Sequence, residues 1–163
     1  LKIAREKNLP VFYTQSERRA DMIDSGVQVG KSHRGAEKTS QEGSHATQTV
    51  APLAPQPQDI LIGKRKPSAF FGTMFMSHLN FLDVDTLILC GCTSSGCLRA
   101  TAVDGYSFNF KVVIPEETAF DRFEASHAMS LFDLNCKYAD VIPTDEVADY
   151  MSALPVRKGP GEA

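Results

Sequence analysis

Short apolar runs alternate with amphipathic segments along most of the chain. Runs with the length and composition of buried strands lie at residues 11–13, 60–62, 87–90, 111–114 and 139–142. Apolar residues at helical spacing predict helices at residues 1–8, 73–82, 97–106 and 123–138, with a last helix from Thr144. Thr73 and Thr144 are predicted to cap their helices. This alternation predicts an α/β fold with a parallel sheet.

The connecting segments show where a site would lie. Residues 14–49 are polar and have no regular period, which is typical of a long functional loop. Residues 51–59 contain three prolines and predict an extended connector. Ligands of open α/β sheets bind beyond the carboxyl ends of the strands. Lys64, Cys97 and residues 115–122 are all expected there.

Composition limits the class of protein. The 163 residues, 42% of them hydrophobic and 23% charged, favour one globular domain that covers residues 1–163. A net charge of −3 argues against a nucleic-acid partner, and the apolar runs are too short to span a membrane. Four cysteines without a secretory segment favour a reducing, cytoplasmic setting. Because the chain begins inside a helical pattern without Met, we expect it to be N-terminally incomplete.

The stretch LILCGCTSSGCLRAT at 87–101 contains the strongest candidate for chemistry. An apolar run is followed by small residues from Gly91 to Gly96, and a helical pattern begins at Cys97. At a helix start, unpaired N–H groups and the macrodipole stabilise a thiolate. This position predicts that Cys97 is a nucleophile. A buried structural cysteine is the alternative, and the local sequence leaves both open.

Other familiar motifs are not matched. The chain has no phosphatase-type Cys-x5-Arg loop, no Gly-x4-Gly-Lys-Ser/Thr and no Gly-x-Gly-x-x-Gly. The spacing of Cys90, Cys92 and Cys97 is not a standard zinc pattern, so zinc is a minor alternative. The histidines form no close pair in sequence and are expected to be surface or capping residues. They are His33, His45, His78 and His127.

Three segments carry a resemblance to a known family. GKRKPSAFFGT at 63–73, LILCGCTSSGCLRATAVDG at 87–105 and VVIPEETAFDR at 112–122 occur in order at suitable separations. They resemble the isochorismatase-like cysteine hydrolase superfamily, most closely its N-carbamoylsarcosine amidase branch, to which the maleamate amidases are related. The resemblance implies a three-layer α/β/α fold around a six-stranded parallel sheet.

The resemblance also implies a triad of cysteine, lysine and aspartate. Cys97 corresponds to the nucleophile and Lys64 to the lysine, and the family's non-proline cis peptide would lie between Cys92 and Thr93. The N–H groups of Thr93 and Cys97 would form the oxyanion hole. The family aspartate, which acts as general acid and base, ends a first strand that would precede Leu1.

That first strand lies in the middle of the family's sheet. Its absence would leave two half-sheets with unpaired buried backbone, at roughly 1–3 kcal/mol for each unsatisfied group. We therefore expect the segment to belong to the working protein. Asp59 and Asp121 lie in other segments and are not assigned the role of the family aspartate.

The resemblance also limits the class of substrate. Arg122 corresponds to the arginine that binds the substrate carboxylate in the carbamoylsarcosine and maleamate branches, and a guanidinium suits a carboxylate. A surface arginine paired with Asp121 or Glu124 is the alternative. Residues 14–18 lack the Asp-x-His pair with which nicotinamidases hold a metal. No catalytic metal and no cofactor are expected.

The implied activity is that of a cysteine-dependent amidohydrolase. It would cleave a linear amide or ureido C–N bond of a small carboxylate-bearing substrate, such as N-carbamoylsarcosine, and release ammonia through a thioester-type intermediate. A maleamate-type amidase is a related alternative, and a homo-oligomer, dimer or tetramer, is expected. The competing class is an inactive family remnant that acts as an oligomeric interaction module. The missing aspartate favours the remnant, whereas Cys97, Lys64 and Arg122 oppose it.

Overall fold

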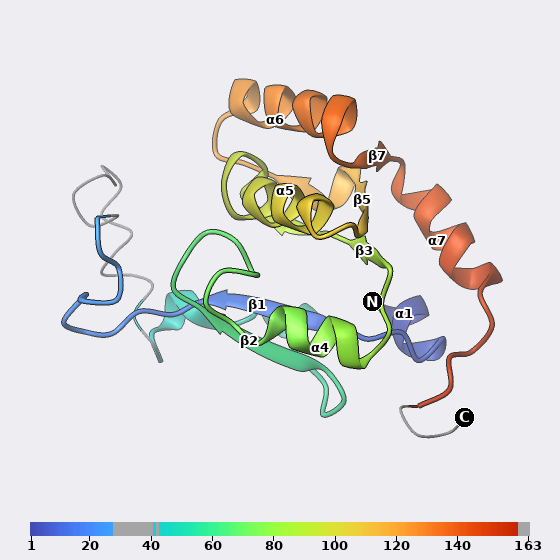
Figure 1. The fold of residues 1–163 in the computed structure, drawn as a ribbon, viewed down its shortest axis with the longest axis horizontal. Coiled ribbons are helices and arrows are strands. Elements are labelled where there is room, and N and C mark those ends of the chain that lie inside the picture. The colour runs from blue at the N-terminus through green and yellow to red at the C-terminus, as the bar shows by residue number, and fades with distance from the viewer. Residues whose placement is uncertain (28–40, 42, 160–163) are drawn as a thin grey trace.

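The computed structural model describes residues 1–27, 41 and 43–159 and has a mixed α/β architecture (Figure 1). The strands are β1 (Phe12–Ser16), β2 (Ile60–Lys64), β3 (Thr86–Ile88), β4 (Gly91–Cys92), β5 (Lys111–Pro115), β6 (Ala119–Phe120) and β7 (Asp140–Ile142). The α-helices are α1 (Lys2–Glu6), α4 (Phe75–Phe81), α5 (Arg99–Ser107), α6 (Glu124–Lys137) and α7 (Thr144–Ala153). Shorter helical turns are η1 (His45–Thr47), η2 (Ala51–Leu53), η3 (Ser94–Leu98) and η4 (Glu116–Thr118). The strand pairs are parallel, which confirms the α/β prediction.

The strands form separate sheets. β1 pairs with β2, β5 lies between β3 and β7, and the short β4 pairs with β6. Within the described residues, no ladder joins β1 to β3, which is the division expected from the sequence, although the second half consists of two separate ladders, β3–β5–β7 and β4–β6. The facing strands are less buried than expected, because most residues of β1 and β3 are only half-buried.

Helix α4 connects the two half-sheets through a shared core. Its buried residues Phe75 and Leu79 belong to one cluster with Ile62 of β2 and Leu87 of β3. Figure 1 shows α4 beside β1 and β2, with the β3–β5 region and α5 above them. The apolar contacts of α4 thus hold the two sheets together, as hydrogen bonds between strands do in a continuous sheet.

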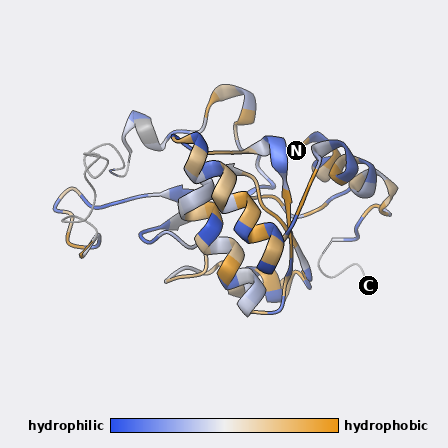
Figure 2. Cartoon of the chain, turned by 90° about the horizontal axis from the view of Figure 1, so that it is seen from above, coloured by the Kyte–Doolittle hydropathy of each residue, from blue (hydrophilic) through white to orange (hydrophobic). Residues whose placement is uncertain are grey.

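A second core lies between β5 and the helices α5 and α6. Ala102 of α5, Ile114 of β5 and Leu134 of α6 are fully buried in it. The helices also carry hydrophilic positions, visible as blue segments beside orange ones in Figure 2. This amphipathic pattern is the helical spacing of apolar residues that predicted the segments.

The strand predicted at 87–90 ends earlier in the structure, and a second short strand follows it. β3 ends at Ile88, and β4 begins at Gly91, whose φ of +109° is rarely adopted by residues with a side chain. The bend lets the first part pair with β5 and the second with β6. The helix predicted from Cys97 also begins later, at Arg99, because residues 94–98 form the wide turn η3 with a kink at Gly96.

The structure differs in part from the predicted helix caps at Thr73 and Thr144. The Thr73 hydroxyl accepts a hydrogen bond from Phe75 N–H at 3.1 Å, although Met74 occupies the N-cap position of α4. Thr144 is the first residue of α7 and does not cap it. Its N–H and hydroxyl instead donate to Glu117 Oε2, at 2.9 and 2.6 Å. The acceptor comes from a segment 27 residues away, which local sequence cannot indicate.

Helix α1 is fixed to the start of β2 by an ion pair. Arg5 Nη2 lies 2.5 Å from Asp59 Oδ2, and Gln56 N–H donates to the same oxygen. Burial alone would raise the pKa of Asp59, but the hydrogen bonds from Arg5 and Gln56 more than offset it and lower the pKa. Asp59 therefore stays ionised and has a structural role.

The loop predicted at 14–49 is tested only in part. Residues 28–40 and 42, and with them His33, lie outside the described residues. At its ends, β1 continues to Ser16, and η1 covers His45–Thr47. In the part of the chain that the structure describes, no helix has the length and apolar composition to cross a membrane.

Leu134→Ala is expected to lower the free energy of unfolding by about 2–5 kcal/mol, because the side chain is fully buried between α6, α5 and β5. Phe132→Ala is the matched control, since Phe132 lies on the same helix and is 62% exposed. Its effect should stay within about 0.5 kcal/mol. Urea denaturation measures both, and equal losses would contradict this description of the core.

Candidate active site

Lys64 is buried at the carboxyl end of β2. The residue is 3% exposed, and its register partner in β1 is Ser16. The ammonium Nζ donates to the carbonyls of Pro67 and Lys66 at 2.9 and 3.1 Å, and Ser16 Oγ lies 3.4 Å away. These partners are neutral, so they hold the ammonium in place without taking up its charge.

The fourth neighbour of the ammonium is the candidate nucleophile. Lys64 Nζ lies 3.2 Å from Cys97 Sγ, which is half-buried in η3. The structure thus brings together the two residues predicted from separate segments, 33 positions apart. The ammonium group thus lies within hydrogen-bond distance of the thiol sulfur.

The turn that carries Cys97 is held from several sides. Thr93 O accepts hydrogen bonds from Gly96 N–H and Leu98 N–H, at 2.9 and 3.2 Å. The Thr101 hydroxyl donates to Cys97 O at 2.8 Å and accepts from Ala69 N–H at 3.1 Å. A Cβ at Gly96 would lie 2.5 Å from Thr93 Oγ1, so a larger residue here would displace the Thr93 side chain. The peptide bond between Cys92 and Thr93 is cis, as expected.

Asp121 fastens the segment after β6 to the same turn. Its Oδ2 accepts from Ser95 Oγ at 2.5 Å, from Ser95 N–H at 2.8 Å and from Ser94 Oγ at 3.3 Å. Its Oδ1 accepts from Arg122 N–H at 2.7 Å. Ser94 Oγ also lies 2.9 Å from His127 Nδ1, so that α6 joins the network. One carboxylate therefore positions the turn before Cys97 and the backbone of Arg122.

This network excludes Asp121 as a proton donor near neutral pH. Desolvation alone would raise its pKa, but the hydrogen bonds from Ser95, Arg122 and Ser94 prevail and lower it from 3.8 to about 2. Asp59, at the opposite end of β2 from Lys64, is paired with Arg5. In the described ranges, no carboxylate is hydrogen-bonded to Lys64 or Cys97.

Arg122 is exposed beside the turn. In the described part of the chain it forms no ion pair with Asp121 or Glu124, and only its backbone N–H bonds to Asp121. Its positive charge acts on the Cys92 thiol, as does that of Lys64. Desolvation of the Cys92 sulfur and the nearby Cys97 raise the pKa of Cys92 despite these cations. Cys92 is therefore a weaker candidate for a thiolate at neutral pH.

The described residues contain no cluster of side chains that could bind a metal ion. No group of three or more His, Cys, Asp or Glu side chains is arranged to hold an ion there. The crowded cysteines 90, 92 and 97 thus do not form the zinc site considered from the sequence.

Several site residues carry no signal in the sequence. Thr101 and Ser94 resemble ordinary small polar residues of a helix and a loop, and His127 was expected to be a surface or capping residue. Their contacts reach from 4 to 33 positions along the chain. The pairing of β4 with β6, two residues each, brings the segments together. Ladders this short leave no pattern of alternation that sequence analysis could detect.

Asp121→Asn should reduce stability above about pH 4 and have little effect near pH 2. The folded-state pKa of Asp121 lies below its ordinary value of 3.8, so its ionised form stabilises the fold above that value. This contribution is lost as pH falls toward about 2. Urea denaturation across this range measures the change. Asp140→Asn, on the exposed Asp140 of β7, is the control and should follow the wild-type pH dependence. Equal curves for all three proteins would contradict the role given to Asp121.

Comparisons with known proteins agree with this geometry. The chain is 36% identical over 154 residues to N-carbamoylsarcosine amidase from an Arthrobacter species, covering 93% of this chain and 58% of that protein. It is 34% identical over 131 residues to maleamate amidohydrolase from Pseudomonas putida, covering 80% and 61%. The chain thus spans less than two thirds of the length of these curated relatives.

The fold has close structural relatives as well. A cysteine hydrolase from Pseudomonas syringae pv. phaseolicola superposes with a TM-score of 0.85 at 24% identity, over 93% of this chain and 76% of that one. A family model described as the isochorismatase domain matches residues 1–146. Since this match covers most of the chain, the chain belongs to the isochorismatase family.

Proposed function

We propose that the whole protein is a cysteine-dependent amidohydrolase that cleaves a linear amide or ureido C–N bond of a small carboxylate-bearing molecule. The observation that carries the proposal is the 3.2 Å contact between Lys64 Nζ and Cys97 Sγ at the carboxyl ends of the strands. The names of two relatives, N-carbamoylsarcosine amidase and maleamate amidohydrolase, support this substrate class.

The proposed reaction has two stages. The Cys97 thiolate attacks the amide carbon, and the N–H groups of Thr93 and Cys97 stabilise the oxyanion. The C–N bond then breaks, the leaving nitrogen gains one proton and departs as ammonia, and a thioester-type acyl-enzyme remains. Water adds to the thioester, the C–S bond breaks, and the acid is released with the free cysteine.

Proton transfer sets a condition on this proposal. The leaving amine needs an acid and the attacking water needs a base. Lys64 is held by carbonyl oxygens, and Asp121 is ionised and engaged in four hydrogen bonds. Neither group suits this proton transfer, so we assign it to an aspartate like that of the family, supplied elsewhere in the whole protein.

The lack of a carboxylate beside Lys64 in the described residues also favours the second candidate, a non-catalytic module on the same fold. The two are separated by measuring ammonia release from N-carbamoylsarcosine, maleamate and their neutral analogues. Turnover in the wild type that disappears in Cys97→Ser supports the enzyme. A fully folded whole protein without turnover on any of these amides would favour the module.

Cys97 should react with iodoacetamide at pH 7 faster than Cys136, although Cys136 is the more exposed thiol. The reason is the neighbouring Lys64 ammonium, which favours the thiolate. In Lys64→Met, labelling of Cys97 should slow at least ~10-fold, corresponding to about 1.4 kcal/mol. Peptide mass mapping gives both rates, with Cys136 as an internal control. Equal rates at both cysteines in the wild type would refute the assignment.

Arg122→Ala should lower kcat/KM on carboxylate-bearing amides by roughly 10- to 150-fold, because a hydrogen bond to a charged group contributes about 1.5–3 kcal/mol. Neutral amides of similar size should be turned over poorly by both forms. Arg99→Ala is a matched control, since Arg99 is paired with Asp133 on α6. Similar losses on acidic and neutral amides would mean that Arg122 supports the fold and does not recognise the substrate.

A further inference from the structure

Arg18 is buried, and no partner for its Nε and Nη1 atoms is found among the described residues. Arg18 follows β1 by two residues and is 8% exposed. Its Nε and Nη1 atoms have no hydrogen-bond partner, and no ion pair in the described residues includes Arg18. Because arginine does not deprotonate in proteins, the group stays charged, and a buried charge is unfavourable until an opposite charge and hydrogen bonds satisfy it.

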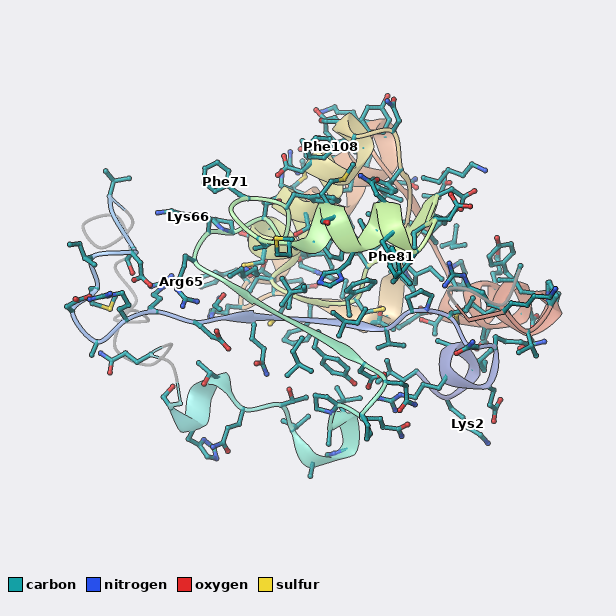
Figure 3. All side chains as sticks on the ribbon, turned by 60° about the horizontal axis from the view of Figure 1, so that its bottom comes forward. Lys2, Arg65, Lys66, Phe71, Phe81 and Phe108 are labelled. Atoms are coloured by element: carbon teal, nitrogen blue, oxygen red, sulfur yellow. The ribbon has the colours of Figure 1, made fainter. Side chains whose placement is uncertain are left out.

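The neighbouring carboxylates are already engaged. Asp21 lies 2.5 Å from Arg19, Asp24 lies 2.7 Å from Arg65, and Glu17 lies 3.5 Å from Arg65. Figure 3 shows Arg65 and Lys66 near the end of β2, so this region of the loops is rich in cations. Among the residues that the structure describes, the carboxylates after β1 therefore do not neutralise Arg18.

Arg18 lines a hollow of about 510 Å³ with Arg19, Ala20, Asp21 and Gln41. This volume lies within the range of small-molecule sites. A parallel bridge between Arg18 and Gln41 holds the two backbones together at its wall. Two arginines and one aspartate leave the lining with a net positive charge, which favours an anion.

We propose that this hollow binds a small carboxylate, with the Arg18 guanidinium as its principal contact. A guanidinium presents several N–H donors in one plane and matches the planar carboxylate, whereas Arg19 already uses its donors on Asp21. Arg18 is close in sequence to a residue that contacts the candidate active site. Ser16, which contacts Lys64, is two residues away, or at most about 7 Å along the backbone.

The carboxylate has two conceivable sources with the same chemistry. It is either the far end of the substrate that reacts at Cys97 or a separate small carboxylate. The proposed binding site does not depend on the proposed function. Only the possibility that the substrate supplies the carboxylate rests on the proposed function.

The test is a thermal-shift and calorimetric titration with succinate at constant ionic strength. Succinate should raise the melting temperature of the wild type, because it binds the folded state, while neutral succinamide should not. Arg18→Met should weaken succinate binding at least tenfold. Its melting temperature without ligand should equal or exceed that of the wild type, because the unpaired charge is gone. Arg18→Lys, which keeps the charge but loses the planar donors, should also bind more weakly.

Arg19→Met is the matched control, because Arg19 lines the same hollow but is paired and exposed. It should keep most of the response to succinate. The proposal is overturned if the wild type does not respond, if Arg18→Met responds like the wild type, or if both methionine variants lose the response equally. The last result would indicate a diffuse electrostatic effect.

Kinetics on the whole protein identify the source. If the substrate supplies the carboxylate, Arg18→Met raises KM for carboxylate-bearing amides and succinate competes with them. If the ligand is separate, KM is unchanged while succinate binding is lost, and succinate still binds after Cys97 has been alkylated. Either result supports the site. If the protein turns over no amide, the titration still decides whether Arg18 binds a carboxylate.

Discussion

The buried ammonium group of Lys64 constrains the arrangement of the candidate site. A charge with so little exposure to water needs hydrogen-bond acceptors, and the chain provides the carbonyls of Lys66 and Pro67. These bonds fix the path of the chain directly after β2. Ser16 and Cys97 complete the surroundings of the group, from β1 and from the turn before α5. One side chain thus relates three segments of the chain to one another.

The two half-sheets contribute different parts of the site. Lys64 belongs to the β1–β2 sheet, whereas Cys97 and Asp121 belong to segments that follow β4 and β6. No strand ladder joins these parts in the described residues. The core around α4 and the contact between Lys64 and Cys97 relate them instead. The geometry of the site therefore depends on side-chain packing as well as on strand pairing.

The charged groups of the molecule differ in how far the described residues satisfy them. Asp121 accepts four hydrogen bonds and Asp59 is paired with Arg5, and both consequently stay ionised in structural roles. Arg122 is exposed, with no carboxylate partner in the described ranges, and Arg18 is buried without one. Satisfied carboxylates thus hold the framework, whereas these two guanidinium groups have no carboxylate partner among the described residues.

The sequence alone determined the α/β class, most strands and helices, the family, and the candidates Cys97 and Lys64. The class, the elements and the position of Cys97 follow from local patterns, such as the small residues that lead from 91 to Cys97. The family and the role of Lys64 follow from the resemblance of three segments to known relatives. Only the tertiary structure placed these two residues 3.2 Å apart and showed that α5 begins at Arg99. It also decided that Glu117 bonds to Thr144 and that Asp121 bonds to Ser94 and Ser95. Such contacts join residues about 27 positions apart through single polar atoms, and hydrophobic periodicity carries no information about them because it records only which face of an element is buried.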